Sequence, residues 1–146
     1  MPTQATIPEG FAPFTRISPL IRPWLPIYAS ERDDRVVLAL TVAEPHLNRR
    51  DTVHGGLLAA LADQAMGMSC AIVLRSQQVP VANLWTSSLT VDYLAASRPG
   101  QWLAFDTIFA RVGKTLCHAE IDITADGATV ARARATFRTQ SSSSSS

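Results

Sequence analysis

Asp63 is the residue whose surroundings favour a role in chemistry. It is the one charged residue of an almost wholly apolar stretch, residues 53–74, which opens on His54-Gly55-Gly56. Because burial disfavours the charged form of a carboxylate, an acid in such a stretch must either be satisfied by nearby donors or be kept there for a reaction. A carboxylate in this setting can act as a general base or as a nucleophile.

The glycine pair suggests a complementary group. Gly55 and Gly56 leave backbone N–H groups unobstructed at the start of a predicted helix, where the helix dipole favours a developing negative oxygen. A carbonyl group bound there would be polarised as in an oxyanion hole. The alternative is that the glycines only permit tight packing where a loop meets the sheet, and the sequence leaves both interpretations open.

The spacing between these two features restricts how they could cooperate. Asp63 follows His54 by nine residues, which is roughly 13 Å along a helix at about 1.5 Å per residue. One small reacting group could not contact both the start of the helix and the Asp63 carboxylate of the same chain. If both act on one substrate, they come from two subunits whose helices lie antiparallel about a two-fold axis, which gives two equivalent sites. Alternatively, Asp63 only binds local donors.

A long helix must carry these groups, because apolar residues recur at helical spacing over residues 53–74. The apolar face contains Leu58, Leu61, Ala65, Met68 and Ile72. The other side is a stripe of mostly small residues, and we expect it to be buried as well: Gly56, Ala59, Ala60, Asp63, Met66, Gly67 and Cys70. The helix is long enough to span a bilayer, but Asp63, Gln64 and the small residues argue against that.

The rest of the chain is typical of strands. A short helix is expected at 18–25, and strands are expected at 27–30, 35–42, 84–95, 102–112, 115–124 and 129–139. Two hairpin turns are indicated, at Gly113-Lys114 and Asp126-Gly127. In the last run, alternation directs Ala131, Ala133, Ala135 and Phe137 towards the helix and Arg132, Arg134, Thr136 and Arg138 outward. The simplest packing is an α+β fold, with one antiparallel sheet wrapped around one long central helix.

Composition narrows the class of protein. The 146 residues fit a single domain at 14–139, preceded by a loose segment at 1–13 and followed by a disordered Ser-rich tail at 140–146. A net charge of +1 gives no support to nucleic-acid or membrane-surface binding. Cys70 and Cys117 are isolated, which fits reduced buried thiols better than a disulfide framework or a zinc site. We therefore expect a cytoplasmic protein without a metal.

The segment HLNRRDTVHGGLLAALADQAMG resembles the signature of hotdog-fold thioesterases, in particular the phenylacetate-pathway (PaaI-like) branch of the 4-hydroxybenzoyl-CoA thioesterase superfamily. The similarity covers about residues 14–138 and includes PLIRPWLPIY, LTVDYLAASRPG and ARVGKTLCHAEIDI. It departs from the family pattern at Asp51, where many relatives have Gly. The loop shape and the placement of Asn48 are therefore open.

The resemblance implies a hotdog fold and hydrolysis of an acyl-CoA thioester to free acid and CoA, with no separate cofactor because CoA is part of the substrate. It implies dimers joined through their sheets, often paired into tetramers, with active sites at the dimer interface. By this resemblance, Asp63 activates water or attacks the thioester carbonyl, and the Gly55 N–H binds the carbonyl oxygen. Asn48 helps to place the water, and His54 supports the helix start.

The resemblance also indicates residues that would contact the substrate. Thr86 matches a hydroxyl position that faces the site in some members. The positions matching CoA-binding residues are Tyr93, Ala95, Arg98, Arg111, Val112, Gly113, Lys114, Thr115 and Arg138. Lys114 could instead be an ordinary turn residue, and Arg138 could be only solvated. His46 and His118 are interpreted as structural.

Two other functions remain open. A hotdog hydratase or dehydratase pairs a catalytic His with an acid on the helix, but it usually has Pro-Gly around the His loop, which is absent here. A non-catalytic acyl-CoA binding or sensing protein would be expected to carry an attached effector segment, for which this chain has no room. The acyl group is left open, with Met66, Leu84 and Trp85 expected as pocket walls that would accept aryl or medium aliphatic chains.

Overall fold

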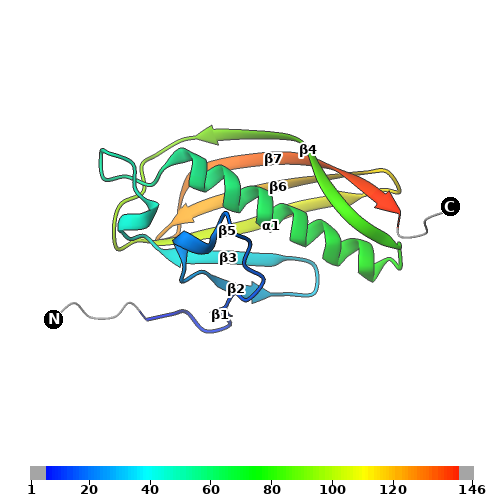
Figure 1. Cartoon of the computed structure of the whole chain (residues 1–146), viewed down its shortest axis with the longest axis horizontal. Helices are drawn as coiled ribbons and strands as arrows, with labels where there is room; N and C mark the ends of the chain where they lie inside the picture. The colour runs from blue at the N-terminus through cyan, green and yellow to red at the C-terminus, as the bar shows by residue number, and fades with distance from the viewer. Residues whose placement is uncertain (1–5, 142–146) are drawn as a thin grey trace.

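One antiparallel sheet packs against one long helix in the computed structural model, which describes residues 6–141 (Figure 1). The order along the chain is β1 (Ala12–Pro13), the 3-10 helix η1 (Arg22–Trp24), β2 (Tyr28–Glu31), β3 (Val36–Thr41), the 3-10 helix η2 (Glu44–His46), α1 (Gly55–Ser76), β4 (Val81–Tyr93), β5 (Trp102–Val112), β6 (Leu116–Ala125) and β7 (Ala128–Ser141). The seven strands lie in the order β1-β2-β3-β5-β6-β7-β4. The predicted α+β fold is confirmed.

The predicted elements differ from the observed ones mainly at their ends. The helix begins at Gly55 rather than at Val53, because Val53 forms a β-bridge with Leu47 and His54 occupies the cap position. The short helix predicted for 18–25 is only the three-residue η1. It ends before Leu25, which has an extended ψ of 149° because it precedes Pro26 and a residue before proline is disfavoured in helical conformation.

Parts of the two segments predicted to be loose or disordered belong to strands of the sheet. Within the segment 1–13, for which the sequence predicted a loose structure, Ala12 and Pro13 pair with β2, and the Phe11 ring meets Trp102 edge-on at 5.3 Å. Residues 1–5 lie outside the described residues. Within the predicted disordered tail, Gln140 and Ser141 belong to β7, and residues 142–146 lie outside the described residues.

The core lies between α1 and the sheet. Leu61, Ala65 and Met66 of α1 are fully buried, as are Leu38 of β3 and Phe105 of β5. In β7 the predicted alternation is confirmed, since Ala131, Ala133, Ala135 and Phe137 are buried while Arg132, Arg134 and Arg138 are exposed. Strand geometry accounts for this, because successive side chains point to opposite faces of a sheet.

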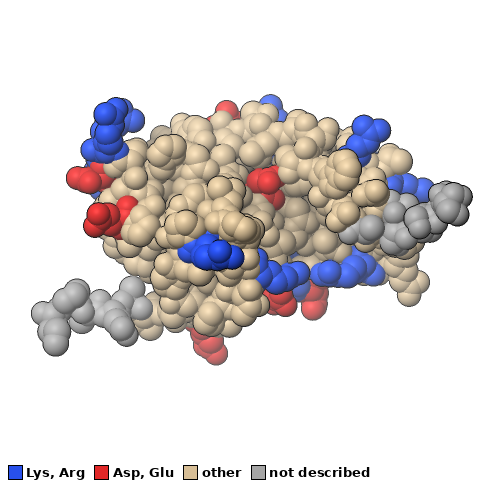
Figure 2. Space-filling model, viewed as in Figure 1, with Lys and Arg blue, Asp and Glu red and all other residues tan. Residues whose placement is uncertain are grey.

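Within one protomer, the second face of α1, which was predicted to be buried, is only partly covered. Met66 and Cys70 of the small-residue stripe are buried, whereas Ala59, Ala60, Asp63 and Gly67 are half-buried and Gly56 is exposed. A single sheet covers one side of a helix, and α1 lies in front of the sheet in Figure 1. Uncharged residues dominate this face of the molecule, and most charged side chains lie towards its rim (Figure 2).

By length and composition alone α1 could cross a membrane, since a window within it has a mean hydropathy of 1.7. Half of that window is buried inside the protein, as is expected for a core helix.

Strand β4 forms one edge of the sheet. It is 13 residues long and pairs with β7 along one side, with register shifts between Val81 and Asn83 and between Thr86 and Ser88. It begins beside the C-terminal end of α1, packs across the helix, and then follows the edge of the sheet (Figure 1). This path brings β4 against the exposed side of α1.

Candidate functional site

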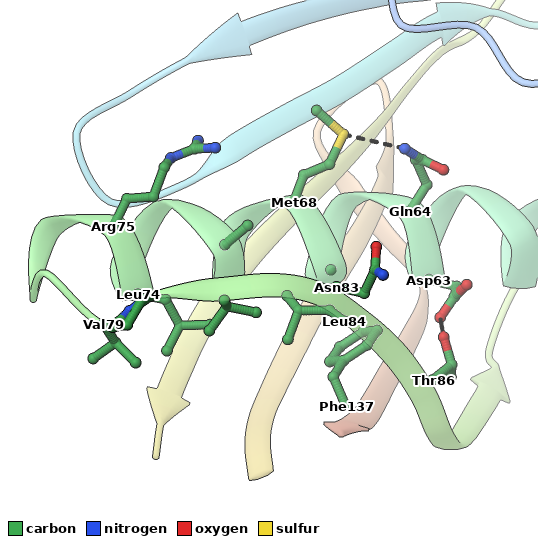
Figure 3. Close-up of a pocket in the computed structure, with 14 residues that line it drawn as sticks. Asp63, Gln64, Met68, Leu74, Arg75, Val79, Asn83, Leu84, Thr86 and Phe137 are labelled. Carbon is green, nitrogen blue, oxygen red and sulfur yellow. Dashed lines mark hydrogen bonds between the residues drawn. The ribbon is translucent and has the colours of Figure 1, made fainter. Parts of the chain in front are cut away.

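A hydrogen bond joins Asp63 of α1 to Thr86 of β4. The Thr86 Oγ1 donates to Asp63 Oδ1 at 2.6 Å (Figure 3). Thr86 faces the helix because it pairs with Phe137, whose side chain is buried beneath α1. A hydroxyl bound to a carboxylate at this distance makes a strong, charge-assisted bond. The second carboxylate oxygen, Oδ2, has no hydrogen-bond partner among residues 6–141 and is available to a ligand.

Asp63 and Thr86 lie at one end of a cleft of about 600 Å³ between α1 and β4. The lining residues are Asp63, Gln64, Gly67, Met68, Ala71, Leu74, Arg75, Val79, Pro80, Val81, Asn83, Leu84, Thr86 and Phe137. Arg75 and Val79 are at the other end (Figure 3).

Of the three predicted pocket walls, only Leu84 lines this cleft. The prediction was wrong for Met66, which is buried in the core, and for Trp85, which is 59% exposed. Trp85 precedes Thr86 in β4, and alternation directs its side chain to the opposite face of the sheet.

The start of α1 offers one backbone donor rather than two. The His54 side chain caps the helix, with its Nδ1 accepting from the Gly56 N–H at 2.8 Å, so the predicted second free amide is occupied. The Gly55 N–H has no acceptor among the described residues. The Gly55 carbonyl accepts from the Tyr93 hydroxyl at 2.8 Å. A Cβ at residue 55 would lie 3.2 Å from the Tyr93 ring, so glycine permits this close approach.

Asn48 organises the loop before the helix. Its Oδ1 accepts from the N–H groups of Arg50 and Thr52, at 2.8 and 3.3 Å, and its Nδ2 donates to Thr52 Oγ1 at 2.9 Å. Asp51 has a φ of 59°, in the left-handed region where glycine is favoured and Asp is tolerated. Glycine, which the family pattern favours at this position, would adopt this conformation without strain. The loop therefore closes with Asp51 in place of Gly.

Asn48 and His54 share a second hollow of about 690 Å³, separate from the cleft that contains Asp63. The other residues that line it are Glu44, Leu47, Arg49, Arg50 and Asp51. The predicted catalytic residues are thus divided, with Asn48, His54 and Gly55 at the start of α1 and Asp63 farther along it.

His46 ties the loop to the helix start. It is 2% exposed, its Nδ1 accepts from the Ala43 N–H at 2.9 Å, and its Nε2 donates to the Trp24 carbonyl at 2.8 Å. Its own carbonyl accepts from the His54 N–H at 2.9 Å. These bonds agree with the structural role predicted for His46, and His118 is exposed on β6.

The residues predicted to bind CoA fall into two groups. Tyr93, Ala95 and Arg98 lie near the helix start, where the Ser97 carbonyl accepts from the Val53 N–H at 2.9 Å. The second group is the β5–β6 hairpin, with Arg111, Val112, Gly113, Lys114 and Thr115, together with Arg138, which pairs with Leu116 and Trp85.

These two groups lie far apart in one protomer. Trp85 and Tyr93 are eight residues apart in β4, which is about 26 Å at the rise of a strand. Arg138 is exposed on the outer face of the sheet, away from α1. One protomer therefore does not bring the two groups together.

The two thiols lie in the core and are poorly suited to nucleophilic chemistry. Burial, together with the neighbouring Cys117, raises the pKa of Cys70 to about 12. Burial also raises the pKa of Cys117. Because the thiolate is the nucleophilic form, both residues stay neutral and inert near neutral pH.

One long helix packed against a seven-stranded antiparallel sheet is the arrangement of the hotdog fold. The model of the thioesterase superfamily matches residues 51–132, and the chain belongs to this family. The Pseudomonas aeruginosa protein named "Putative esterase PA0474" is 33% identical over 132 residues, which span 90% of this chain and 96% of that protein. Human acyl-coenzyme A thioesterase 13 is 28% identical over 104 residues, or 70% of this chain and 71% of that protein.

Solved structures agree with this family. A hypothetical thioesterase from Streptococcus pneumoniae with coenzyme A has a TM-score of 0.67 and 25% identity, over 79% of this chain and 89% of its own. The N33D mutant of the phenylacetic acid degradation protein PaaI from Thermus thermophilus has a TM-score of 0.70 and 20% identity, over 83% of this chain and 98% of its own. The second likeness shows the fold alone.

Proposed function

We propose that the protein hydrolyses an acyl-CoA thioester to a free acid and CoA. The observation that carries this proposal is the carboxylate of Asp63, held by Thr86 with its second oxygen free, at the mouth of a cleft of about 600 Å³. Membership of the thioesterase superfamily supports it, as do the relative named acyl-coenzyme A thioesterase 13 and the neighbour crystallised with coenzyme A. CoA is part of the substrate, and no separate cofactor is proposed.

In the proposed reaction Asp63 acts at the thioester carbonyl. As a general base it removes a proton from water, whose oxygen then bonds to the carbonyl carbon; as a nucleophile it bonds to that carbon itself and water later releases the acid. In either route the C–S bond breaks and the CoA sulfur leaves as a thiolate that takes up a proton. The Gly55 N–H would stabilise the negative oxygen of the tetrahedral intermediate.

We propose that each site combines two protomers. Gly55 and Asp63 are eight residues apart on α1, which is about 12 Å along the helix. The two groups of predicted CoA-binding residues are likewise separated within one chain. The free edge of β4 could pair with the same strand of a second copy, which would place Gly55 and Tyr93 of one chain near Asp63 of the other. A dimer is the minimum, and a pair of dimers is consistent with the half-covered face of α1.

The buried, unpaired thiols fit a cytoplasmic protein, which is the compartment that we propose.

Release of free thiol from acyl-CoA thioesters tests this function. We expect wild-type protein to release CoA, and Asp63→Asn to lower the turnover number by at least about 1,000-fold while CoA still binds, because the base is removed but the shape is kept. The control is the oligomeric state and thermal unfolding of the variant, which should match wild type. Thiol release that survives in Asp63→Asn would contradict the assignment. Binding without thiol release in wild type would instead favour an acyl-CoA sensor.

A further inference from the structure

Gly67 has no side chain and so leaves an opening in the wall of the cleft. Neither the packing nor the backbone conformation of the fold requires glycine at this position. It lies one helical turn after Asp63 on the side of α1 that lines the cleft. A Cβ at this position would meet only the Phe137 ring, at 3.4 Å, which is ordinary contact. Glycine in the middle of a helix is destabilising relative to alanine. Within one protomer, the glycine is thus explained neither by crowding nor by backbone conformation, and its effect is to keep the cleft open.

The space beyond Gly67 is larger than a small acyl group needs. The cleft of about 600 Å³ falls within the 300–1,000 Å³ typical of sites for drug-sized ligands. From Asp63 to Leu74 the helix advances 11 residues, or about 16 Å. An acetyl group at Asp63 would leave most of this length empty.

Most of the side chains that line the cleft beyond Gly67 are apolar. Ala71, Leu74, Val79 and Leu84 line this part, with the side chains of Asn83 and Arg75 beside them, and no acidic side chain other than Asp63 is among the lining residues. Burying each methylene of a ligand against such walls is favourable. The carboxylate and hydroxyl that could act at a thioester carbonyl, those of Asp63 and Thr86, are together at one end, and Arg75 is at the other (Figure 3).

We propose that the acyl group is an extended apolar chain that runs from Asp63 past Gly67 towards Leu74, and that Gly67 determines the longest chain accepted. This inference rests on the proposed function and specifies its substrate class. The chain lies along α1 between the Phe137 ring and Leu84, and a larger side chain at residue 67 blocks its path.

The test compares wild type with Gly67→Ala and Gly67→Leu on acetyl-, hexanoyl-, decanoyl- and phenylacetyl-CoA. We expect kcat/KM in wild type to rise at least about 100-fold from acetyl to decanoyl, since each buried methylene contributes several-fold. Gly67→Leu should lower kcat/KM for decanoyl-CoA by at least about 100-fold and leave acetyl-CoA within about threefold, because only the space beyond residue 67 is lost. Gly67→Ala should be intermediate.

The matched control is Ser76→Leu, which adds the same side chain to the exposed end of α1, outside the cleft. It should leave the chain-length profile unchanged. A wild-type profile that is flat or favours acetyl-CoA would overturn the proposal, as would a loss in Gly67→Leu that is equal for all thioesters. A phenylacetyl rate that falls in Gly67→Leu while the decanoyl rate does not would also overturn it.

Binding measurements separate this inference from the function on which it rests. If wild type hydrolyses none of these thioesters, the proposed function fails, and calorimetric titration with the same compounds still tests chain-length selection. Affinity that rises with chain length in wild type and not in Gly67→Leu supports the inference. Affinity that is independent of chain length in wild type overturns it.

Discussion

Thr86 and Asp63 are 23 residues apart in the sequence and are joined by a 2.6 Å hydrogen bond that connects the edge strand β4 to the middle of α1. This bond fixes one carboxylate oxygen and leaves the other without a hydrogen-bond partner among the described residues. The strand that borders the cleft therefore also holds its acid. Any change in the position of β4 would alter both the cleft and the carboxylate.

Replacing Thr86 with Val tests this connection. Val keeps the β-branched shape but lacks the hydroxyl, and a hydrogen bond to a charged group contributes about 1.5–3 kcal/mol. If Asp63 needs this bond for orientation, Thr86→Val should lower the turnover number for an acyl-CoA by about 10- to 100-fold. Thr86→Ser keeps the donor and should stay within a few-fold of wild type. Equal activity of the Val and Ser variants would show that the hydroxyl plays no part.

The Tyr93 hydroxyl should contribute to the stability of the helix start. Tyr93→Phe removes the bond to the Gly55 carbonyl and should lower the free energy of unfolding by about 0.5–1.5 kcal/mol in denaturant titration. The matched control is Tyr28→Phe. The Tyr28 ring packs against Trp102, and its hydroxyl forms no hydrogen bond to the described residues. A loss as large for Tyr28→Phe as for Tyr93→Phe would refute this role.

His46 should matter to stability far more than His118. His46→Gln cannot satisfy both the Ala43 N–H and the Trp24 carbonyl at once, and each buried group left without a partner costs about 1–3 kcal/mol. We expect His46→Gln to lower the free energy of unfolding by at least about 2 kcal/mol. The same change at the exposed His118 should stay within about 0.5 kcal/mol. Similar values for the two variants would contradict this account.

Cys70 makes stability depend on alkaline pH. Its pKa is about 12 in the folded protein, against 9.0 for an ordinary thiol, so above pH 9 the unfolded chain loses a proton that the folded chain keeps. Stability from the neutral thiol is thus complete below pH 9 and is lost as pH rises towards 12, with a slope of about 1 kcal/mol per pH unit. Cys70→Ala should show a shallower decline between pH 9 and 11 in denaturant titrations. Parallel curves for the two proteins would disprove the assignment.

The elements of this fold could be predicted because they are encoded locally. The predicted strand at 102–112 coincides with β5, and the alternation of Ala and Arg correctly predicted the two faces of β7. The helix followed from its apolar spacing. The resemblance implied that His54 supports the helix start, which agrees with its position as the cap. The particular bond that it accepts from the Gly56 N–H depends on the side-chain rotamer and was not predicted.

The site depends on relationships that local sequence does not contain. The bond between Asp63 and Thr86 requires β4 to lie at the edge beside β7, and the resemblance suggested Thr86 without indicating its partner. Trp85 was wrongly predicted to be a pocket wall, because the sequence does not show which of two neighbouring residues in a strand points towards the helix. The register shift in β4 between Thr86 and Ser88 makes the alternation harder to follow. Gly67 was assigned only to a stripe of small residues. Its place beside Phe137 becomes visible once α1 and β7 are packed together.

The two borders of the sheet are unequal, since β1 has two residues and β4 has 13. A long strand with an open hydrogen-bonding side is a template onto which other extended chains can add. In the dimer proposed above, this open side of β4 is covered by the second protomer, so a protomer that has not yet paired would expose it. Overproduction, or a substitution that slows dimerisation, should therefore cause the protein to aggregate at temperatures well below that of thermal unfolding.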